Sequence, residues 1–180
     1  MAGYAAQDQC TYTPAIHRVV ESGAVDSAQV PFNLLNPTAG YAVPPGFPGQ
    51  GLDRLLTRTR AQRMGVVVIR VLAAGALSGE LARHPIAVPE VDPIASGPDY
   101  ATDVGRAQTF RALVKEGHAA SVVEAALRFP LGSEAVSTVL LGYSSLDHLE
   151  GAAAAVAKGP LSPEAQARLE ACWAELARAR

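Results

Sequence analysis

The sequence predicts an α/β protein built on a parallel sheet, and two observations lead to this fold class. Four short apolar runs that favour strands alternate along the 180 residues with segments of helical periodicity. The run Val66–Arg70 is almost continuously β-branched, which is typical of a strand covered on both faces in a parallel sheet. Strands connected through helices form right-handed units. The pattern leaves two architectures open, an open doubly wound sheet and part of a (β/α)8 barrel.

The composition is that of a globular protein and excludes several classes of function. Hydrophobic residues make up 49% of the chain and charged residues 18%, so the chain can bury a core. The net charge of -2 and the lack of a basic cluster predict no nucleic-acid partner. No apolar run of about 18 residues predicts a membrane span, and no signal peptide is expected. Cys10 and Cys172 are predicted to be reduced thiols, which favours a cytoplasmic location.

The first elements in order are a strand, a helix and a second strand. Met1–Ala6 is a short apolar run. Thr13 and Pro14 are typical of a helix N-cap and first turn, and Gly23 is typical of the residue after the end of that helix. Ser27–Phe32 is predicted to be the second strand because of its apolar residues.

Two loops rich in proline and glycine flank the central strand. Asn33–Gly51 is predicted to be the first loop, and the amphipathic segment Leu52–Met64 a helix stopped by Gly65. Val71–Pro98 is predicted to be the second loop. A loop of this length in a compact domain is usually functional or mobile.

The remainder of the chain predicts helices around one last strand. Residues 99–129 are predicted to form two helices broken near Gly117. Val136–Leu141 is predicted to be a strand, Leu146–Lys158 its helix, and Ser162 the start of a final helix. This final helix carries one apolar stripe, formed by Leu169, Cys172, Trp173 and Leu176.

A glycine turn joins the last strand to its helix. Gly142 lies where the strand must turn, Ser144 or Ser145 can cap the helix, and Ser144 with Asp147 has the form of a capping box. Such a junction directs free N–H groups and the positive end of a helix dipole at one place, which suits a phosphate. An ordinary strand–helix junction without a ligand has the same features, so both interpretations stay open.

Three segments in this order resemble the aldo/keto reductases. Val25–Asn36 resembles the sixth strand of that family, Gly65–Gly79 its seventh strand and following loop, and Val136–Glu150 its eighth strand and helix. Gly159–Pro163 is similar to the run before the family's terminal helix. The resemblance implies an α/β fold of the (β/α)8 barrel type, here a partial (half) barrel with parallel strands and a C-terminal extra helix. Residues 1–180 would form a single partial domain.

The resemblance implies reduction of a small carbonyl compound, or oxidation of an alcohol, with NADP or NAD as the cofactor. Met1–Ala6 would end the fifth strand, and a whole barrel takes about 250 residues. The family carries its catalytic Asp, Tyr, Lys and His on the first four strands. None of the four histidines and five tyrosines of this chain is therefore assigned to that tetrad.

The cofactor site of the family lies largely on strands five to eight, and the resemblance carries it over to nine residues here. Gln29 falls on the glutamine that holds the nicotinamide carboxamide, a role that suits a primary amide because it both donates and accepts. The alternative is a polar residue at the barrel mouth without this role. At the fifth strand Ala5 replaces the usual Ser or Thr, so part of this contact would be absent.

The seventh-strand resemblance implies contacts with the pyrophosphate and the nicotinamide. Arg70 and Leu72 fall at these positions, although the common family pattern is Ser-Pro-Leu and this chain has Arg-Val-Leu. Arg70 could bind phosphate as a fork of donors or pair with an acid. Gly75, Leu77 and Gly79 keep the form of the family loop.

The eighth-strand resemblance implies contacts near the adenosine phosphate. Leu141, Gly142, Tyr143 and Ser145 match these positions, and His148 occupies a position often held by Arg in NADPH users. An imidazole is mostly neutral at pH 7, so NADH stays possible as the cofactor. The alternative is that His148 is simply an exposed helix residue.

A half barrel without the tetrad has a second interpretation. It could be a non-catalytic protein that binds nucleotide or self-associates, since open sheet edges favour pairing with another chain. The isolated chain is expected to be catalytically silent on either interpretation.

Overall fold

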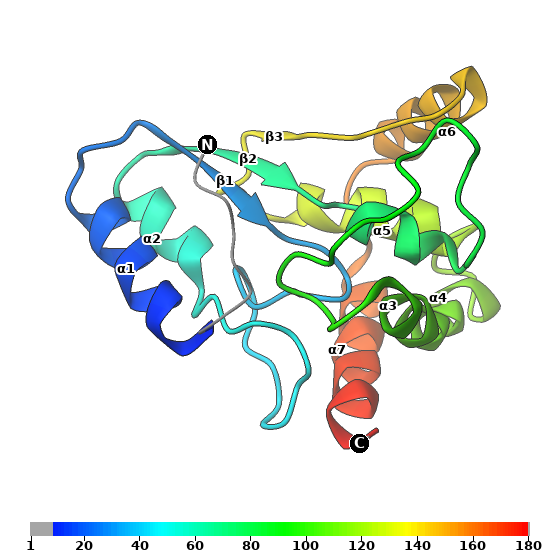
Figure 1. Ribbon diagram of the computed structural model, residues 1–180, viewed down its shortest axis with the longest axis horizontal. Helices are drawn as coiled ribbons and strands as arrows, with labels where there is room; N and C mark the ends of the chain where they lie inside the picture. Colours follow the sequence, from blue (N-terminus) through cyan, green and yellow to red (C-terminus); the bar gives the residue numbers. More distant parts are fainter. Residues whose placement is uncertain (1–8, 180) are drawn as a thin grey trace.

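The computed structural model describes residues 9–179, and the side chains of residues 13–179. The expected end of a fifth strand at Met1–Ala6, with Ala5, lies outside the described residues. The strands β1 (Ser27–Pro31), β2 (Gly65–Ile69) and β3 (Thr138–Val139) form one parallel sheet in the order β1-β2-β3 (Figure 1). The predicted fold class, parallel α/β, is confirmed.

The two faces of this sheet differ in burial. Val30, Val66 and Val68 are fully buried on the face that the helices cover. The register places Gln29 beside Val67 and Val67 beside Thr138 on the opposite face, where both outer residues are exposed and Val67 is only half-buried. The expectation that β2 is covered on both faces is therefore not met in the described part of the chain.

The helix α1 (Gln9–Glu21) begins earlier than the sequence predicts, and Pro14 lies inside it. The hydroxyl of Thr13 does not cap this helix but donates to the carbonyl of Gly51 at 2.7 Å. His17 Nε2 lies 3.2 Å from the carbonyl oxygen of Leu52. These contacts link α1 to the loop before α2 (Leu55–Ala61), and the two helices lie side by side (Figure 1).

The helix α2 is shorter than predicted because the backbone before it is not helical. Asp53 and Arg54 have φ values of 45° and 52°, which lie in the left-handed region. The predicted start at Leu52 is therefore wrong, and a regular helix forms only after Arg54.

The predicted helical region 99–129 contains three α-helices rather than two. They are α3 (Tyr100–Ala107), α4 (Arg111–Lys115) and α5 (Val122–Arg128), with short 3₁₀ turns η2 (Gln108–Phe110) and η3 (Phe129–Gly132). The predicted break near Gly117 is confirmed, since this glycine has a φ of 79°. Asp99 and Ser121 cap α3 and α5 by accepting backbone N–H groups.

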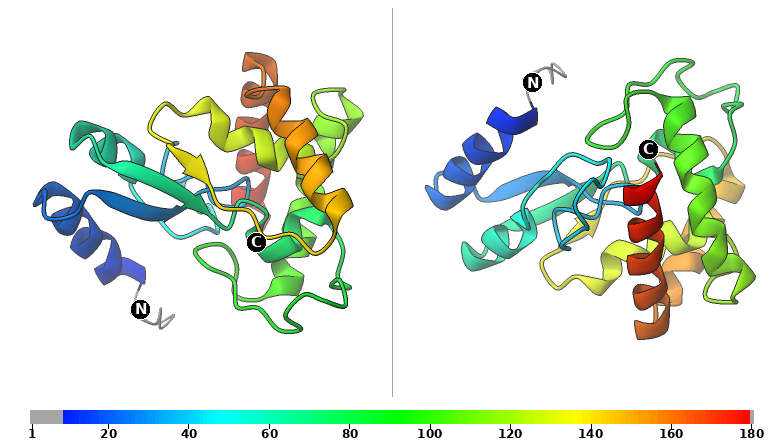
Figure 2. Two further views of the ribbon diagram at one scale, coloured as in Figure 1. Left: turned by 90° about the horizontal axis from the view of Figure 1, so that it is seen from above. Right: turned by 90° about the horizontal axis from the view of Figure 1, so that it is seen from below.

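The C-terminal helix α7 (Pro163–Arg178) closes the core with the stripe expected from the sequence. Figure 2 shows this helix beside α4, and it packs on both α4 and η2. Trp173 Nε1 donates to the carbonyl of Leu34 at 3.0 Å, which ties the end of the chain to the loop after β1. Cys172 is a buried free thiol, and burial raises its pKa to about 11. A thiol with this pKa is inert at neutral pH.

The last strand and helix differ from the prediction in their boundaries. β3 spans only two residues, although the Leu140 N–H still donates to the carbonyl of Val68 at 2.8 Å. Helix α6 (Leu146–Ala157) begins as predicted, and Ser145 is its N-cap. Ser145 Oγ accepts from the N–H of His148, so the capping box expected at Ser144 is wrong by one residue. No helix within residues 9–179 has the length and apolar character needed to cross a membrane.

Candidate functional site

The ends of β1 and β2 are joined by a buried asparagine. Asn33 follows β1, and its Nδ2 donates to the carbonyl of Arg70 at 2.8 Å. Its Oδ1 accepts from the N–H groups of Leu35 and Asn36, both at 2.9 Å. Sequence reasoning did not single out Asn33, although an Asn directly after a strand is a signal for this kind of turn. The asparagine fixes where the chain leaves the carboxyl end of the sheet.

The chain turns back sharply after β2 through a series of left-handed residues. Arg70, Ala73, Ala74 and Gly75 have φ values of 58°, 47°, 59° and 103°. The carbonyl of Leu72 accepts the N–H of Gly75 at 2.8 Å and closes the turn. The short 3₁₀ segment η1 (Ala73–Ser78) thus lies inside the predicted loop. Non-glycine residues in this region are strained, and such strain is common at ligand sites.

The guanidinium of Arg70 is half-buried at the start of this turn. Burial lowers its pKa, and the positive charge of Arg83 lowers it further, while Asp92 acts in the opposite direction. Within the described residues the Arg70 side chain has no hydrogen bond and no ion pair within 4 Å. A desolvated cation without an acid in contact is suited to bind an anionic ligand.

The residues expected near the adenosine phosphate lie together between β3 and α6. Leu141 is half-buried against the core, whereas Tyr143 is 58% exposed. A Cβ at Gly142 would meet no atom within 4 Å, and its φ is not positive, so the turn does not require glycine there. Ser145 is the N-cap of α6 and His148 lies in its first turn, as described above.

The long loop after η1 reaches across to this first turn. The ring of His84 lies 5.8 Å from the ring of His148 in an edge-to-face arrangement. His148 Nδ1 also accepts from the N–H of Ser144 at 3.4 Å. The loop therefore connects the β2 end with the start of α6, which the sequence could not indicate because residues 84 and 148 are far apart in the chain.

The nine residues expected to bind a cofactor fall into two groups and one single position. Arg70, Leu72 and Gly75 lie at the end of β2, and the group from Leu141 to His148 lies beside α6. Gln29 lies apart from both groups, in the middle of β1 on the more open face of the sheet. Among the described residues no three His, Cys, Asp or Glu side chains are placed to bind a metal.

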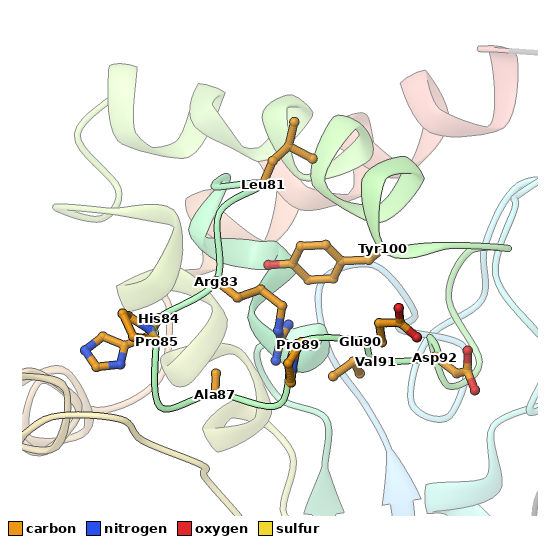
Figure 3. A pocket seen from close by; sticks show the side chains of 10 residues that line it. All are labelled: Leu81, Arg83, His84, Pro85, Ala87, Pro89, Glu90, Val91, Asp92 and Tyr100. Carbon is orange, nitrogen blue, oxygen red and sulfur yellow. The ribbon is translucent and has the colours of Figure 1, made fainter.

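A depression of about 540 Å³ lies next to the β2 group, between the loop and α3 (Figure 3). Arg83 and Tyr100 lie side by side in it, and neither residue is among those predicted from the sequence. The residues lining the depression are Leu81, Arg83, His84, Pro85, Ala87, Pro89, Glu90, Val91, Asp92 and Tyr100.

A sequence model described as the aldo/keto reductase family matches residues 53–174. The chain belongs to the aldo/keto reductase family. Solved aldo/keto reductases have a similar fold: the aldo-keto reductase AKR11C1 from Bacillus halodurans, in its holo form, matches with a TM-score of 0.57 and 19% identity. Its apo form matches with a TM-score of 0.54 and the same identity. The family resemblance expected from the sequence is confirmed.

The extent of these matches confirms the expected partial barrel. The alignment with the holo form covers 88% of this chain but only 46% of the other chain, and the apo form gives 88% and 47%. The chain thus spans about half the length of the aldo/keto reductases that it matches. No curated protein sequence matches this chain.

Proposed function

We propose that this chain carries the cofactor-binding half of an NAD(P)H-dependent aldo/keto reductase. The observation that carries the proposal is the half-buried Arg70 guanidinium, which has no acid within 4 Å in the described part of the chain and lies beside a left-handed turn. An electropositive turn at the carboxyl end of parallel strands suits a dinucleotide diphosphate. Gln29, at mid-strand on the open face, can hold the carboxamide by donating and accepting at once.

When bound, the dinucleotide supplies the hydride for carbonyl reduction. The chain itself orients the cofactor through Gln29, Arg70 and the turn with Leu72 and Gly75. The adenosine end would lie against the residues from Leu141 to His148. No residue of this chain is proposed as catalytic, so activity requires the first half of a barrel.

Titration of the purified chain with NADPH and with NADH, followed by cofactor fluorescence, tests the proposal. Saturable binding that Gln29→Ala weakens by about 10-fold supports it, a loss typical of one good hydrogen-bonding group. Thr138→Ala is the matched control, because Thr138 is exposed on the same face and has no proposed contact. Absence of binding to the wild-type chain, or equal binding by the Gln29 variant, would contradict the proposal.

The choice between the two cofactors is proposed to depend on His148. Since an imidazole offers a 2′-phosphate fewer donors than a guanidinium does, the wild-type chain should bind NADPH and NADH with similar affinity. His148→Arg should tighten NADPH binding by about 10-fold and leave NADH unchanged, because an arginine forms charge-assisted bonds with phosphate. An equal change for both cofactors would argue against contact with the 2′-phosphate.

A second candidate function, self-association, is favoured by the open face of the sheet and by α6. Leu146, Leu149 and Val156 of α6 are 72%, 42% and 46% exposed and recur at helical spacing. We propose that a second copy of this chain covers this stripe. Each chain spans about half the length of the aldo/keto reductases that it matches, so two copies together have about as many residues as one whole barrel. We also propose that residues 1–180 are a single partial domain of a cytoplasmic protein, consistent with the buried free thiol of Cys172.

A further inference from the structure

Arg83 occupies the loop that follows η1, and three contacts fix its guanidinium. Its Nε donates to the carbonyl of Val88 and its Nη1 to the carbonyl of Ala74, both at 2.7 Å. The guanidinium carbon lies 5.1 Å from the centre of the Tyr100 ring, within the range of cation–π attraction. Figure 3 shows the Arg83 side chain extended beside this ring.

Tyr100 brings α3 into the same set of contacts. Its hydroxyl donates to the carbonyl of Glu80 at 3.1 Å. A Cβ built on Gly75 would lie 3.4 Å from the Tyr100 hydroxyl oxygen and 3.8 Å from Arg83 Nη1. The turn after β2 therefore packs directly on both side chains.

The turn needs support from outside because its own backbone is strained. Ala73 and Ala74 both have positive φ values, and each left-handed alanine costs about 1 kcal/mol. Such conformations persist only where the surroundings hold them. The hydrogen bond from Arg83 to the carbonyl of Ala74 acts on the strained residue itself.

Arg83 also places a second positive charge near Arg70. The repulsion between the two guanidiniums contributes, after burial, to the lowered pKa of Arg70. Asp92 offsets this repulsion in part. An anion bound beside both arginines would relieve it, because guanidinium groups bind phosphate through paired donors.

We propose that Arg83 is a positioning residue of the cofactor site, clamped by Tyr100. Its bond to Ala74 fixes the turn, and its charge joins that of Arg70 in attracting the diphosphate of a dinucleotide. The attraction of the diphosphate rests on the proposed function, whereas the clamp on the turn depends only on contacts within the chain.

Hydrogen exchange of the backbone amides of residues 74–78 tests the clamp without any ligand. Arg83→Met and Tyr100→Leu should each raise exchange there by about 10-fold, the effect of losing a charge-assisted contact of about 1.4 kcal/mol. Arg111→Met is the control, because Arg111 is exposed and its one side-chain hydrogen bond within the described residues goes to Gln108 and not to the turn. Exchange at the wild-type rate in Arg83→Met, with the melting temperature unchanged, would overturn the clamp.

Binding of NADH, NADPH and inorganic diphosphate tests the role of the charge. Arg83→Met should weaken all three by about 10-fold and make binding less sensitive to salt, and Arg83→Lys should restore the salt sensitivity. Cofactor binding by the wild-type chain that Arg83→Met leaves unchanged would overturn the role of Arg83 and leave the proposed function intact. Failure of the wild-type chain to bind a dinucleotide would reject the proposed function and the charge role together, and hydrogen exchange alone would then decide the clamp.

Discussion

Ala73 and Ala74 are two adjacent alanines in a conformation that favours glycine. Their φ values are 47° and 59°, and Gly75 follows with 103°. A Cβ in the left-handed region crowds the following carbonyl oxygen. Each alanine therefore stores strain that a glycine would not have, at the centre of the proposed cofactor site.

Ala74→Gly should raise the free energy of unfolding by about 0.5 to 1 kcal/mol, since the strain removed exceeds the added chain entropy. Ala76→Gly is the control, because Ala76 is buried and has no positive φ; it should lower stability by about 1 kcal/mol or more. Urea unfolding of the two variants measures both effects. Equal destabilisation by both glycines would mean that residue 74 is not strained.

Asp103 is a carboxylate that the fold leaves only partly satisfied. It is 1% exposed, its Oδ2 accepts from Ser96 Oγ at 2.5 Å, and its Oδ1 has no hydrogen-bond partner among the described residues. Burial raises its pKa, although Ser96 and Arg106 act in the opposite direction. The ionised form is therefore less favourable in the folded chain than in the unfolded chain.

Asp103→Asn should raise the melting temperature near neutral pH. Because the folded-state pKa of Asp103 is raised, its stability contribution is full below the unfolded-state value of 3.8 and is lost as the pH rises through the folded value. The variant lacks this loss, so its advantage should grow as the pH rises above the unfolded-state value and then stay constant once Asp103 is ionised in the folded chain.

The cap residue Asp99 is the control for this prediction, because its pKa is shifted in the opposite direction. The N–H and hydroxyl of Thr102 lower its pKa, so its contribution is present above the ordinary carboxyl pKa and is lost as the pH falls through the lowered value. Asp99→Asn should therefore be less stable than the wild-type chain near neutral pH and match it in acid. Parallel pH profiles for the two variants would argue against burial as the cause at Asp103.

At the scale of elements, one arginine joins α5 to the junction of α6 and α7. Arg128 Nε and Nη2 donate to the carbonyls of Gly159 and Pro160, both at 2.9 Å. Its Nη1 donates to Glu124 Oε1 at 3.1 Å, and Lys158 Nζ donates to Glu124 Oε2 at 2.6 Å. These two donors hold the pKa of Glu124 below its usual range, and the hydrogen bond from Lys158 has the larger effect. Three charged side chains and two carbonyl groups thus share one small network.

Arg128→Met should lower the free energy of unfolding by about 2 to 3 kcal/mol, because the carbonyls of Gly159 and Pro160 and the largely buried Glu124 carboxylate all lose a charged donor. Arg60→Met removes an ion pair with Glu134 between two exposed side chains and should change stability by less than about 1 kcal/mol. Denaturant unfolding compares them. Similar losses in both variants would show that the Arg128 network is no stronger than a surface pair.

At the scale of the whole molecule, the sheet is the feature that stays incomplete. Within the described residues it has three strands, its faces are unequally buried, and α6 carries an exposed apolar stripe. A parallel sheet is normally covered on both faces. These uncovered apolar surfaces are the basis of the self-association proposed above.

Light scattering should report a discrete dimer of the purified chain, and Leu149→Glu should shift the mass toward the monomer. Leu149 is 42% exposed on α6 and is not one of the proposed cofactor residues, so the melting temperature should change little. Glu150→Gln, on the neighbouring exposed position, is the control and should leave the mass unchanged. A monomeric wild-type chain, or a dimer that Leu149→Glu leaves intact, would reject self-association through α6.

Periodicity in the sequence was sufficient where an element depends on its own residues. Within the described residues the alternation of apolar runs predicted the order of β1, β2 and β3 and the helical regions between them, and the stripe from Leu169 to Leu176 is buried as expected. The break near Gly117 depends on a single residue with a specific backbone preference and was predicted, and Ser145 was one of the two serines predicted to cap α6. The resemblance to the aldo/keto reductases predicted that these elements form half of a barrel, and the comparisons confirm this prediction.

The sequence by itself determined the parallel α/β fold, because hydrophobic period and turn residues act locally. Only the tertiary structure decided which distant groups meet: Asn33 with the carbonyl of Arg70, and Arg83 with Tyr100 and Ala74. The structure also showed that α1 begins before Pro14 and that β3 has only two residues. These outcomes depend on hydrogen bonds and charges between segments far apart in the chain, and no local pattern encodes those pairings.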